Sequence, residues 1–305
     1  MGNHHNHVRE AGNYSRAFAV GIALNTAFVV VEAIYGLLAG SLALLADAGH
    51  NVSDVVSLLL AWGASVLATR TATERRTYGL RKATVMASLA SAVLLLLALG
   101  GIAREAVERL TNPTPVAGAT VIVVAAVGVI VNTATALLFR KGRKHDLNIR
   151  GAFLHMAADA LVSAGVVVAG GLALWFGWTW LDPVVSLLIA AVIVWGTWSL
   201  FRQSLHLLFD GVPEGVDLHA VHSLLQGLPG VAQVHDLHVW AMGTNETALT
   251  AHLVMPAGGG DDAFLQHATD ELHEHFEIRH VTLQVVREAF CEGCAGASFA
   301  SAASG

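Results

Sequence analysis

The chain has 305 residues, of which 54% are hydrophobic and only 13% are charged, and its mean hydropathy is +0.59. About a quarter of the residues of a water-soluble globular protein are charged, so this composition excludes a soluble enzyme and also disordered, collagen-like and coiled-coil chains. Residues 1–202 hold 15 Lys and Arg against 10 Asp and Glu, whereas residues 203–305 hold 2 against 13. We therefore predict an integral membrane part followed by an acidic part in water.

The membrane part contains six apolar stretches, each about as long as the roughly 20 residues that a helix needs to cross a bilayer. Turn-forming sequences such as Ala39-Gly40-Ser41 separate these stretches. The second and fourth connections are rich in Arg and Lys, whereas the first and fifth have none, so the positive-inside rule places both termini in the cytoplasm. The predicted spans are roughly residues 17–38, 42–68, 83–103, 115–139, 152–178 and 181–201.

The acidic part has the pattern of a small soluble domain. Residues 216–228 and 261–278 have helical spacing, while three segments alternate as strands do, and Gly243-Thr244-Asn245 marks a hairpin turn between the first two of them. The order α-β-β-α-β predicts an α+β domain with its helices on one face of a three-stranded sheet.

The expected domain organisation has five parts. A polar, His-containing tail precedes a six-helix transmembrane domain, a linker, a cytoplasmic domain and a C-terminal tail with a Cys-x-x-Cys motif. The histidines at the start of the chain fit either weak metal binding or a plain polar tail. The five parts are residues 1–14, 15–203, 204–215, 216–290 and 291–305.

Ionisable residues within membrane spans are costly, and they usually face a cavity and serve a function. The second span contains His50 and Asp54, and the fifth contains His155 and Asp159, with four-residue spacing in both cases. This spacing puts both side chains on one helix face, so that two facing helices offer two nitrogens and two carboxylates to one ion. This set suits a tetrahedral Zn2+ ion and neutralises its charge. A His and an Asp one turn apart also fit a hydrogen-bonded pair, but the duplicate favours a metal site.

Two further acidic residues lie in the predicted spans. Asp47 shares the helix face of His50 and Asp54, and it fits an accessory metal ligand, a proton acceptor or a carboxylate at a helix start. For Glu32 in the first span we expect a hydrogen-bonding role rather than metal ligation.

Five motifs together are typical of one family: Asp47-x-x-His50-x-x-x-Asp54, His155-x-x-x-Asp159, the segment from Ser41 to Asp47, Asp182-Pro183, and Val234-His235-Asp236-Leu237-His238-Val239-Trp240. With them the chain resembles the cation diffusion facilitators of the zinc-transporter type, over nearly its whole length. The resemblance implies a homodimer of six-span protomers, a ferredoxin-like cytoplasmic domain, and export of Zn2+ from the cytoplasm in exchange for protons through His50, Asp54, His155 and Asp159.

The same resemblance implies a regulatory zinc site at His235 and His252, which the predicted hairpin places on neighbouring strands. Some similar proteins add a C-terminal pair of cysteines, which Cys291 and Cys294 match. Two cysteines are half of a zinc site, so these two fit either regulatory metal binding or an Ala/Ser/Gly-rich tail. The acidic charge of the domain suits cation collection and argues against a nucleic-acid partner.

Three classes of function compete: a Zn2+/H+ antiporter that also accepts Cd2+ or Co2+, a membrane zinc sensor that does not transport, and an intramembrane metalloprotease. The sequence contains no His-Glu-x-x-His motif, which disfavours the protease, and we expect no enzyme activity. Zinc and protons compete for the same ligands, which is the basis for exchange. The composition and short loops are typical of a bacterial protein. We therefore expect the chain to lie in the inner membrane, in contact with its lipids.

Overall fold

The computed structural model describes residues 23–139 and 147–288, which fall into two compact units. The first unit contains the described residues up to Leu59 together with Ser91–Ser199, and the second contains Leu60–Ala90 together with the residues from Leu200 onward. The first unit is entirely helical, whereas the second contains a β-sheet.

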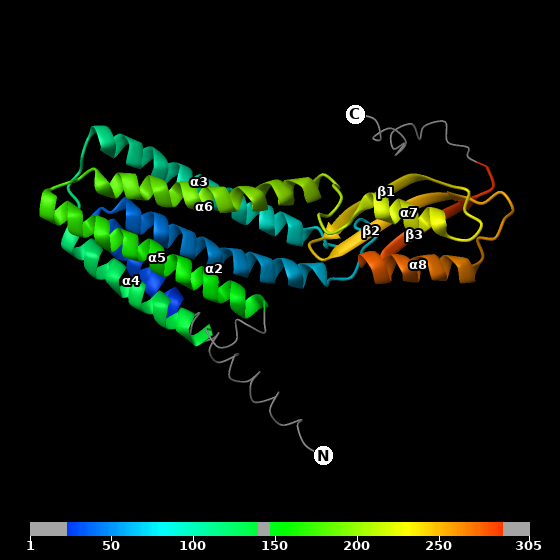
Figure 1. Ribbon diagram of the computed structural model, residues 1–305, viewed down its shortest axis with the longest axis horizontal. Helices are drawn as coiled ribbons and strands as arrows, with labels where there is room; N and C mark the ends of the chain where they lie inside the picture. The colour runs from blue at the N-terminus through cyan, green and yellow to red at the C-terminus, as the bar shows by residue number, and fades with distance from the viewer. Residues whose placement is uncertain (1–22, 140–146, 289–305) are drawn as a thin grey trace, which may run out of the picture. The chain divides into compact units, whose positions relative to one another are not determined.

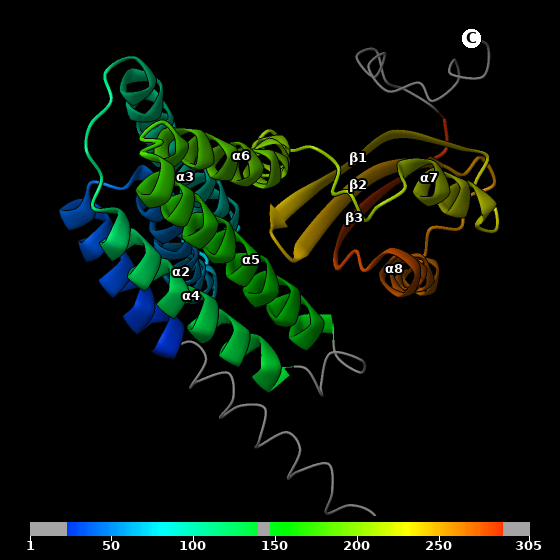
Figure 2. The same cartoon turned by 60° about the vertical axis from the view of Figure 1, so that its left-hand side comes forward.

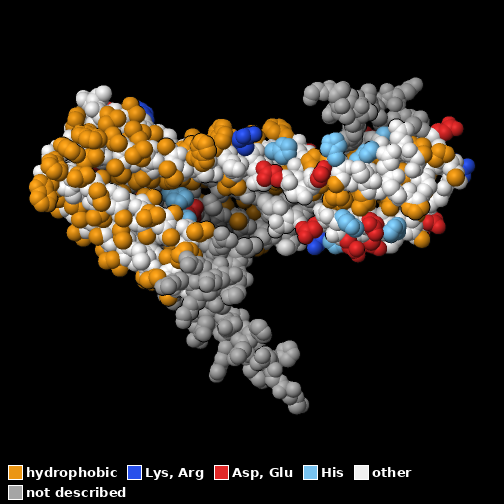
Figure 3. Space-filling view, viewed as in Figure 1, with side chains coloured by type: hydrophobic (Ala, Val, Ile, Leu, Met, Phe, Trp, Pro, Cys, Tyr) orange, Lys and Arg blue, Asp and Glu red, His pale blue; other side chains and the backbone are white. Residues whose placement is uncertain are grey.

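Among the described residues, five helices are long and apolar enough to cross a membrane, and a shorter apolar helix, Ala23–Ala39, precedes them. Their surfaces are rich in hydrophobic side chains (Figure 3), and Trp175 and Trp195 are almost fully exposed, as expected of residues that face lipid. The five long helices are α2 (Leu42–Ala68), α3 (Ala83–Thr111), α4 (Gly118–Phe139), α5 (Leu147–Phe176) and α6 (Leu181–Leu208) (Figure 1).

The helices match the predicted spans, but several are longer than their apolar stretches. Helix α3, for example, continues to Thr111, well past the predicted end at residue 103. Its last turns are polar and contain an ion pair between Arg109 Nε and Glu105 Oε1, 2.9 Å apart and four residues apart in sequence. Pairs with this spacing stabilise a helix in water, so hydrophobicity locates the membrane segment rather than the end of the helix.

Helices α4 and α5 pack side by side in both ribbon views (Figures 1 and 2). Close to them, a Cβ added at Gly128 in α4 would lie 2.7 Å from the Phe28 ring and 3.0 Å from the Ser163 hydroxyl. Only glycine allows the first helix and α5 to approach α4 this closely, and glycines commonly serve this purpose between membrane helices. The core of the helical unit includes Phe28, Leu44 and Val166.

The sheet of the second unit has the predicted α-β-β-α-β order. Strand β1 (Gln233–Gly243) pairs antiparallel with β2 (Glu246–Val254), and β3 (His280–Val286) pairs parallel with β2. The two-residue turn between β1 and β2 falls at the predicted Gly-Thr-Asn sequence. Helices α7 (Leu218–Gly227) and α8 (Asp262–Phe276) both pack on the face of the sheet that includes Leu249, Ala251 and Leu253, as predicted.

The connection between the first helix and α2 fixes where α2 begins. Gly40 has a φ of +66°, and the amides of Gly40 and Ser41 donate to the carbonyls of Leu37 and Gly36, which closes the first helix in the arrangement that favours glycine. The Ser41 hydroxyl then accepts from the Leu44 amide at 3.3 Å and so caps α2.

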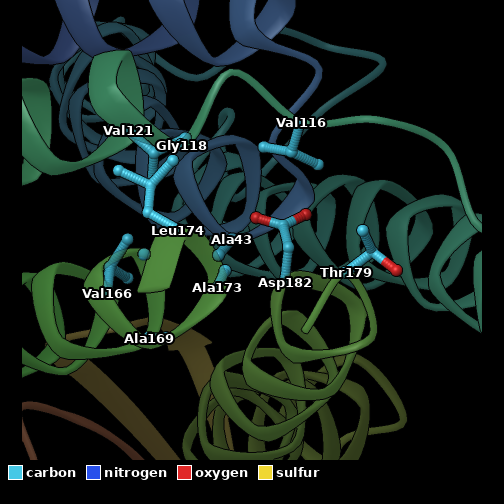
Figure 4. Close-up of a pocket in the computed structure, with 11 residues that line it drawn as sticks. Ala43, Val116, Gly118, Val121, Val166, Ala169, Ala173, Leu174, Thr179 and Asp182 are labelled. Carbon is cyan, nitrogen blue, oxygen red and sulfur yellow. The ribbon is translucent and has the colours of Figure 1, made fainter. Parts of the chain in front are cut away.

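A carboxylate from another helix completes this cap. Asp182 in the first turn of α6 accepts hydrogen bonds from the Ser41 hydroxyl at 2.5 Å and from the Leu42 amide at 2.8 Å. Figure 4 shows Asp182 beside Ala43 in the lining of a small cavity. Two bonds to one carboxylate hold the start of α2 against α6, which explains why an acidic residue opens the last membrane helix.

Replacing Asp182 by Asn should lower the apparent melting temperature of the purified protein, because an amide keeps only one acceptor oxygen for these two donors. We expect a destabilisation of about 1–3 kcal/mol, the usual cost of disrupting a buried hydrogen bond to a charged group. The measurement is thermal unfolding in detergent, with the exposed Asp262→Asn as the matched control. An equal melting temperature for both variants would show that Asp182 does not anchor α2.

Candidate metal centre

Helix α2 presents His50 and Asp54 on one face, one turn apart. His50 Nε2 lies 3.8 Å from Asp54 Oδ2. Helix α5 presents His155 and Asp159 in the same way, with 3.5 Å between His155 Nε2 and Asp159 Oδ2. The four-residue spacing therefore produces the same local geometry on both helices.

The two helices bring these side chains to one place. His155 Nε2 lies 3.2 Å from Asp54 Oδ2 across the helix pair, and the imidazole rings of His50 and His155 are 5.7 Å apart in an edge-to-face arrangement. Ligand atoms of His50, His155 and Asp159 all lie within 4.8 Å of one another. A tetrahedral ion with bonds of about 2.0–2.2 Å fits atoms at this separation after small side-chain adjustments.

Several donor atoms at this centre lack a well-oriented hydrogen bond. They are His50 Nδ1, Asp54 Oδ2 and Asp159 Oδ2, all of them buried. Buried polar atoms are normally paired, so atoms without partners point to a group that completes the site. Two nitrogens and two carboxylates can hold one divalent cation with no net charge left over.

Exposure changes sharply along α2 at this centre. The side chains of Asp54 and His155 are 41% and 39% exposed, and that of His50 is 25% exposed. One turn nearer the start of α2, Asp47 is 3% exposed and Ala46 is completely buried. Histidine side chains are visible between the helices in Figure 3. The α2 side chains of the centre are therefore more exposed than the residues one turn nearer the start of α2, and this buried side is called the closed side.

The two further acidic residues lie on the closed side. Ser163 of α5 donates a hydrogen bond of 3.3 Å to Asp47 Oδ2. Glu32 is completely buried, and neither of its carboxylate oxygens makes a well-oriented hydrogen bond. The side chain that interacts most directly with Glu32 is that of Asp47, and Asp159 also acts on it, so the expected hydrogen-bonding role of Glu32 stays a prediction.

The sheet of the second unit brings together the other predicted ligand pair. His235 and His252 are directly paired across β1 and β2, with ring centroids 5.1 Å apart, and the buried His235 Nε2 has no hydrogen-bonding partner. Cys291 and Cys294, like the histidines at the start of the chain, lie outside the described residues.

Two more side chains join this pair, and sequence reasoning missed both. Asp236 Oδ1 lies 3.1 Å from His238 Nε2, and Asp236 Oδ2 lies 3.6 Å from His252 Nε2. Asp236 has a φ of +53° within the register shift between His235 and His238. Such backbone strain in a non-glycine residue is concentrated at functional sites. The His-Asp-x-His string was the available signal, but strict alternation would have put Asp236 on the opposite face from His235.

Two models of known protein domains match most of this chain. The model of the cation efflux transmembrane domain matches residues 18–209, and that of the cation efflux protein cytoplasmic domain matches residues 213–287. The chain belongs to the cation efflux family. This confirms the resemblance seen in the motifs, and the family is one of transporters rather than enzymes.

Relatives of this cation efflux protein are similar over nearly their whole length. It is 34% identical to the "Cadmium, cobalt and zinc/H(+)-K(+) antiporter" of Bacillus subtilis, over 95% of this chain and 93% of the relative. It is also 34% identical to "Zinc transporter ZitB" of Pectobacterium atrosepticum, over 93% and 89% of the two chains. The "Metal cation efflux system protein CzcD" of Cupriavidus metallidurans has the same identity over 93% of this chain and 90% of its own.

Replacing His155 by Ala should weaken Zn2+ binding to this centre by at least about 100-fold, because it removes a nitrogen ligand that faces both Asp54 and Asp159. Isothermal titration of the purified full chain measures this affinity with and without the His155→Ala change. All proteins compared also carry His252→Ala, which removes a predicted ligand of the second unit. The control is His267→Ala, which changes an exposed histidine of α8. Equal affinities for the two variants would exclude His155 as a ligand.

Proposed function

We propose that this chain is a secondary active transporter that exports Zn2+, and also Cd2+ or Co2+, from the cytoplasm in exchange for protons. The observation that carries the proposal is the convergence of His50, Asp54, His155 and Asp159 from α2 and α5. The printed names of the relatives, which include zinc, cadmium and cobalt transport and an antiporter, support the same cargo and mechanism.

Proton exchange follows from the chemistry of the ligands. Zinc binds neutral imidazole and ionised carboxylate, so its binding releases any protons that these groups hold, and protonation of the groups releases zinc. A site that is open to one side at a time converts this competition into exchange. The exposure difference between Asp54 and Asp47 supports a state that is open on one side and closed on the other.

The orientation follows from the positions of the basic loops. The open side of the centre faces the end of α2, and the connection that follows α2 carries several arginines. The positive-inside rule assigns this connection, and with it both termini, to the cytoplasm. The structure then corresponds to the state that binds Zn2+ from the cytoplasm. The membrane in this proposal is the inner membrane of a bacterium.

Zinc flux into proteoliposomes under an imposed pH gradient tests the proposal. Asp54→Ala and Asp159→Ala should each reduce the flux at least about 100-fold, because each leaves the dication incompletely ligated and neutralised. Glu108→Ala, which changes an exposed acidic residue of α3, is the control and should transport at the wild-type rate. Undiminished flux in both Asp variants would exclude the four-residue centre formed by His50, Asp54, His155 and Asp159. Zinc binding without flux in the wild type would instead identify a sensor.

For the second unit we propose a regulatory zinc site at His235 and His252, completed by Asp236 and His238. The unpaired nitrogen of His235 and the short distances around Asp236 support this assignment. The match of this unit to the cytoplasmic domain of the family, whose model is named for dimerisation, supports a homodimer.

Asp236→Ala should remove about one bound Zn2+ per protomer from the full chain, because it withdraws the carboxylate shared by two histidines. Equilibrium dialysis at limiting zinc, followed by metal analysis, measures the stoichiometry. Asp270→Ala, at an exposed position of α8, should leave the stoichiometry unchanged. The same metal content in both variants would show that the Asp236 carboxylate is not a ligand.

A further inference from the structure

A second group of oxygen atoms lies on the closed side of the metal centre. It consists of the Glu32 and Asp47 carboxylates, which interact with each other, and the Ser163 hydroxyl, which donates to Asp47. The three residues come from the first helix, α2 and α5 and are 0%, 3% and 1% exposed. This oxygen cluster is one helical turn from His50, so an ion can pass between the two places by a short step.

The oxygen cluster has no Lys or Arg partner among the described residues. Neither carboxylate makes an ion pair with Lys or Arg there. Another acid, Asp159, acts electrostatically on both, and the His155 imidazole acts on Asp47. Burial of an unpaired carboxylate costs several kcal/mol even after the protein relaxes. In membrane spans such residues persist where they serve ion pathways.

The unpaired atoms of the cluster point to a missing ligand. Neither oxygen of Glu32 makes a well-oriented hydrogen bond, although the side chain is completely buried. Asn51 contributes a further signal: its Nδ2 donates to the Asp47 carbonyl, while its buried Oδ1 has no partner. The side chain with which Glu32 interacts, Asp47, is itself an acid, so the pair lacks a cation.

We propose that Glu32 and Asp47, with the Ser163 hydroxyl, form a second binding station for the divalent cation on its way out. This inference rests on the proposed transport function and adds a step to it. The four-residue centre neutralises its own cation with Asp54 and Asp159, so the charge of Glu32 and Asp47 remains available for a second cation position. Two carboxylates neutralise one dication in an environment that does not tolerate net charge.

The donor types of the two places set the direction of transfer. The four-residue centre offers nitrogen and oxygen, which zinc prefers, whereas the oxygen cluster offers oxygen alone, which suits harder cations. Zinc is therefore held more weakly at the second station. Ion conduction needs sites that bind the ion strongly enough for it to enter and weakly enough for it to leave. An oxygen-only station meets the second condition.

The test uses Mn2+ as the probe, because oxygen ligands suit this ion, and counts bound Mn2+ by electron paramagnetic resonance of the full chain in lipid nanodiscs. All proteins carry His252→Ala to remove a proposed ligand of the second unit. Glu32→Gln should lower the bound Mn2+ by about one ion per protomer, while the His50→Ala/His155→Ala double variant should keep that ion. Glu108→Gln, the same change at an exposed position of α3, should bind as the parent does.

Flux measurements separate this inference from the proposed function. Glu32→Gln should reduce zinc flux at least about tenfold while the zinc affinity of the four-residue centre changes less than about threefold, because those four ligands are intact. Unchanged zinc flux in the double histidine variant would defeat the proposed function. Unchanged Mn2+ binding in Glu32→Gln would defeat the second station alone. If proton release changed while Mn2+ binding did not, Glu32 and Asp47 would be assigned to proton binding instead. Should Glu32→Gln fail to fold, Asp47→Asn decides by the same criteria.

Discussion

The helical unit depends on one electrostatic constraint: carboxylates buried among apolar helices need a positive partner. Asp54, Asp159, Asp47 and Glu32 lie close together in a part of the molecule that otherwise consists almost entirely of hydrophobic side chains. In the described part of the chain, the positive groups that act on Asp54, Asp159 and Asp47 are imidazoles rather than permanently charged Lys or Arg. A structure of this kind is most stable when a cation is bound and least stable when the site is both empty and ionised.

The same constraint explains why cargo and counter-ion exclude each other. A metal ion and protons satisfy the same negative charge, so the occupied forms resemble each other electrostatically, whereas a form with neither is penalised. An alternating-access protein needs such a penalty, because a carrier that reorients while empty and charged would dissipate the gradient that drives it.

Much of the architecture is accessible from the sequence because it depends on local patterns. Hydrophobic length located the membrane helices, alternation located the three strands, and the repeated His-x-x-x-Asp spacing identified the side chains that meet between α2 and α5. The surroundings of Glu32 and the place of Asp236 were not accessible in this way. Glu32 depends on which helices pack together, and Asp236 depends on a register shift that reverses the direction of its side chain.

The cap that Asp182 provides has a mechanical consequence. It fixes the first residue of α2 against α6, so a tilt of this helix about that end displaces its far residues most. At a rise of about 1.5 Å per residue, Asp54 lies about 18 Å from the pivot and His50 about 12 Å, so a given tilt carries the carboxylate about one and a half times as far as the imidazole. A small tilt therefore lengthens the distance from Asp54 to the ion before that from His50, and the ion is released in steps.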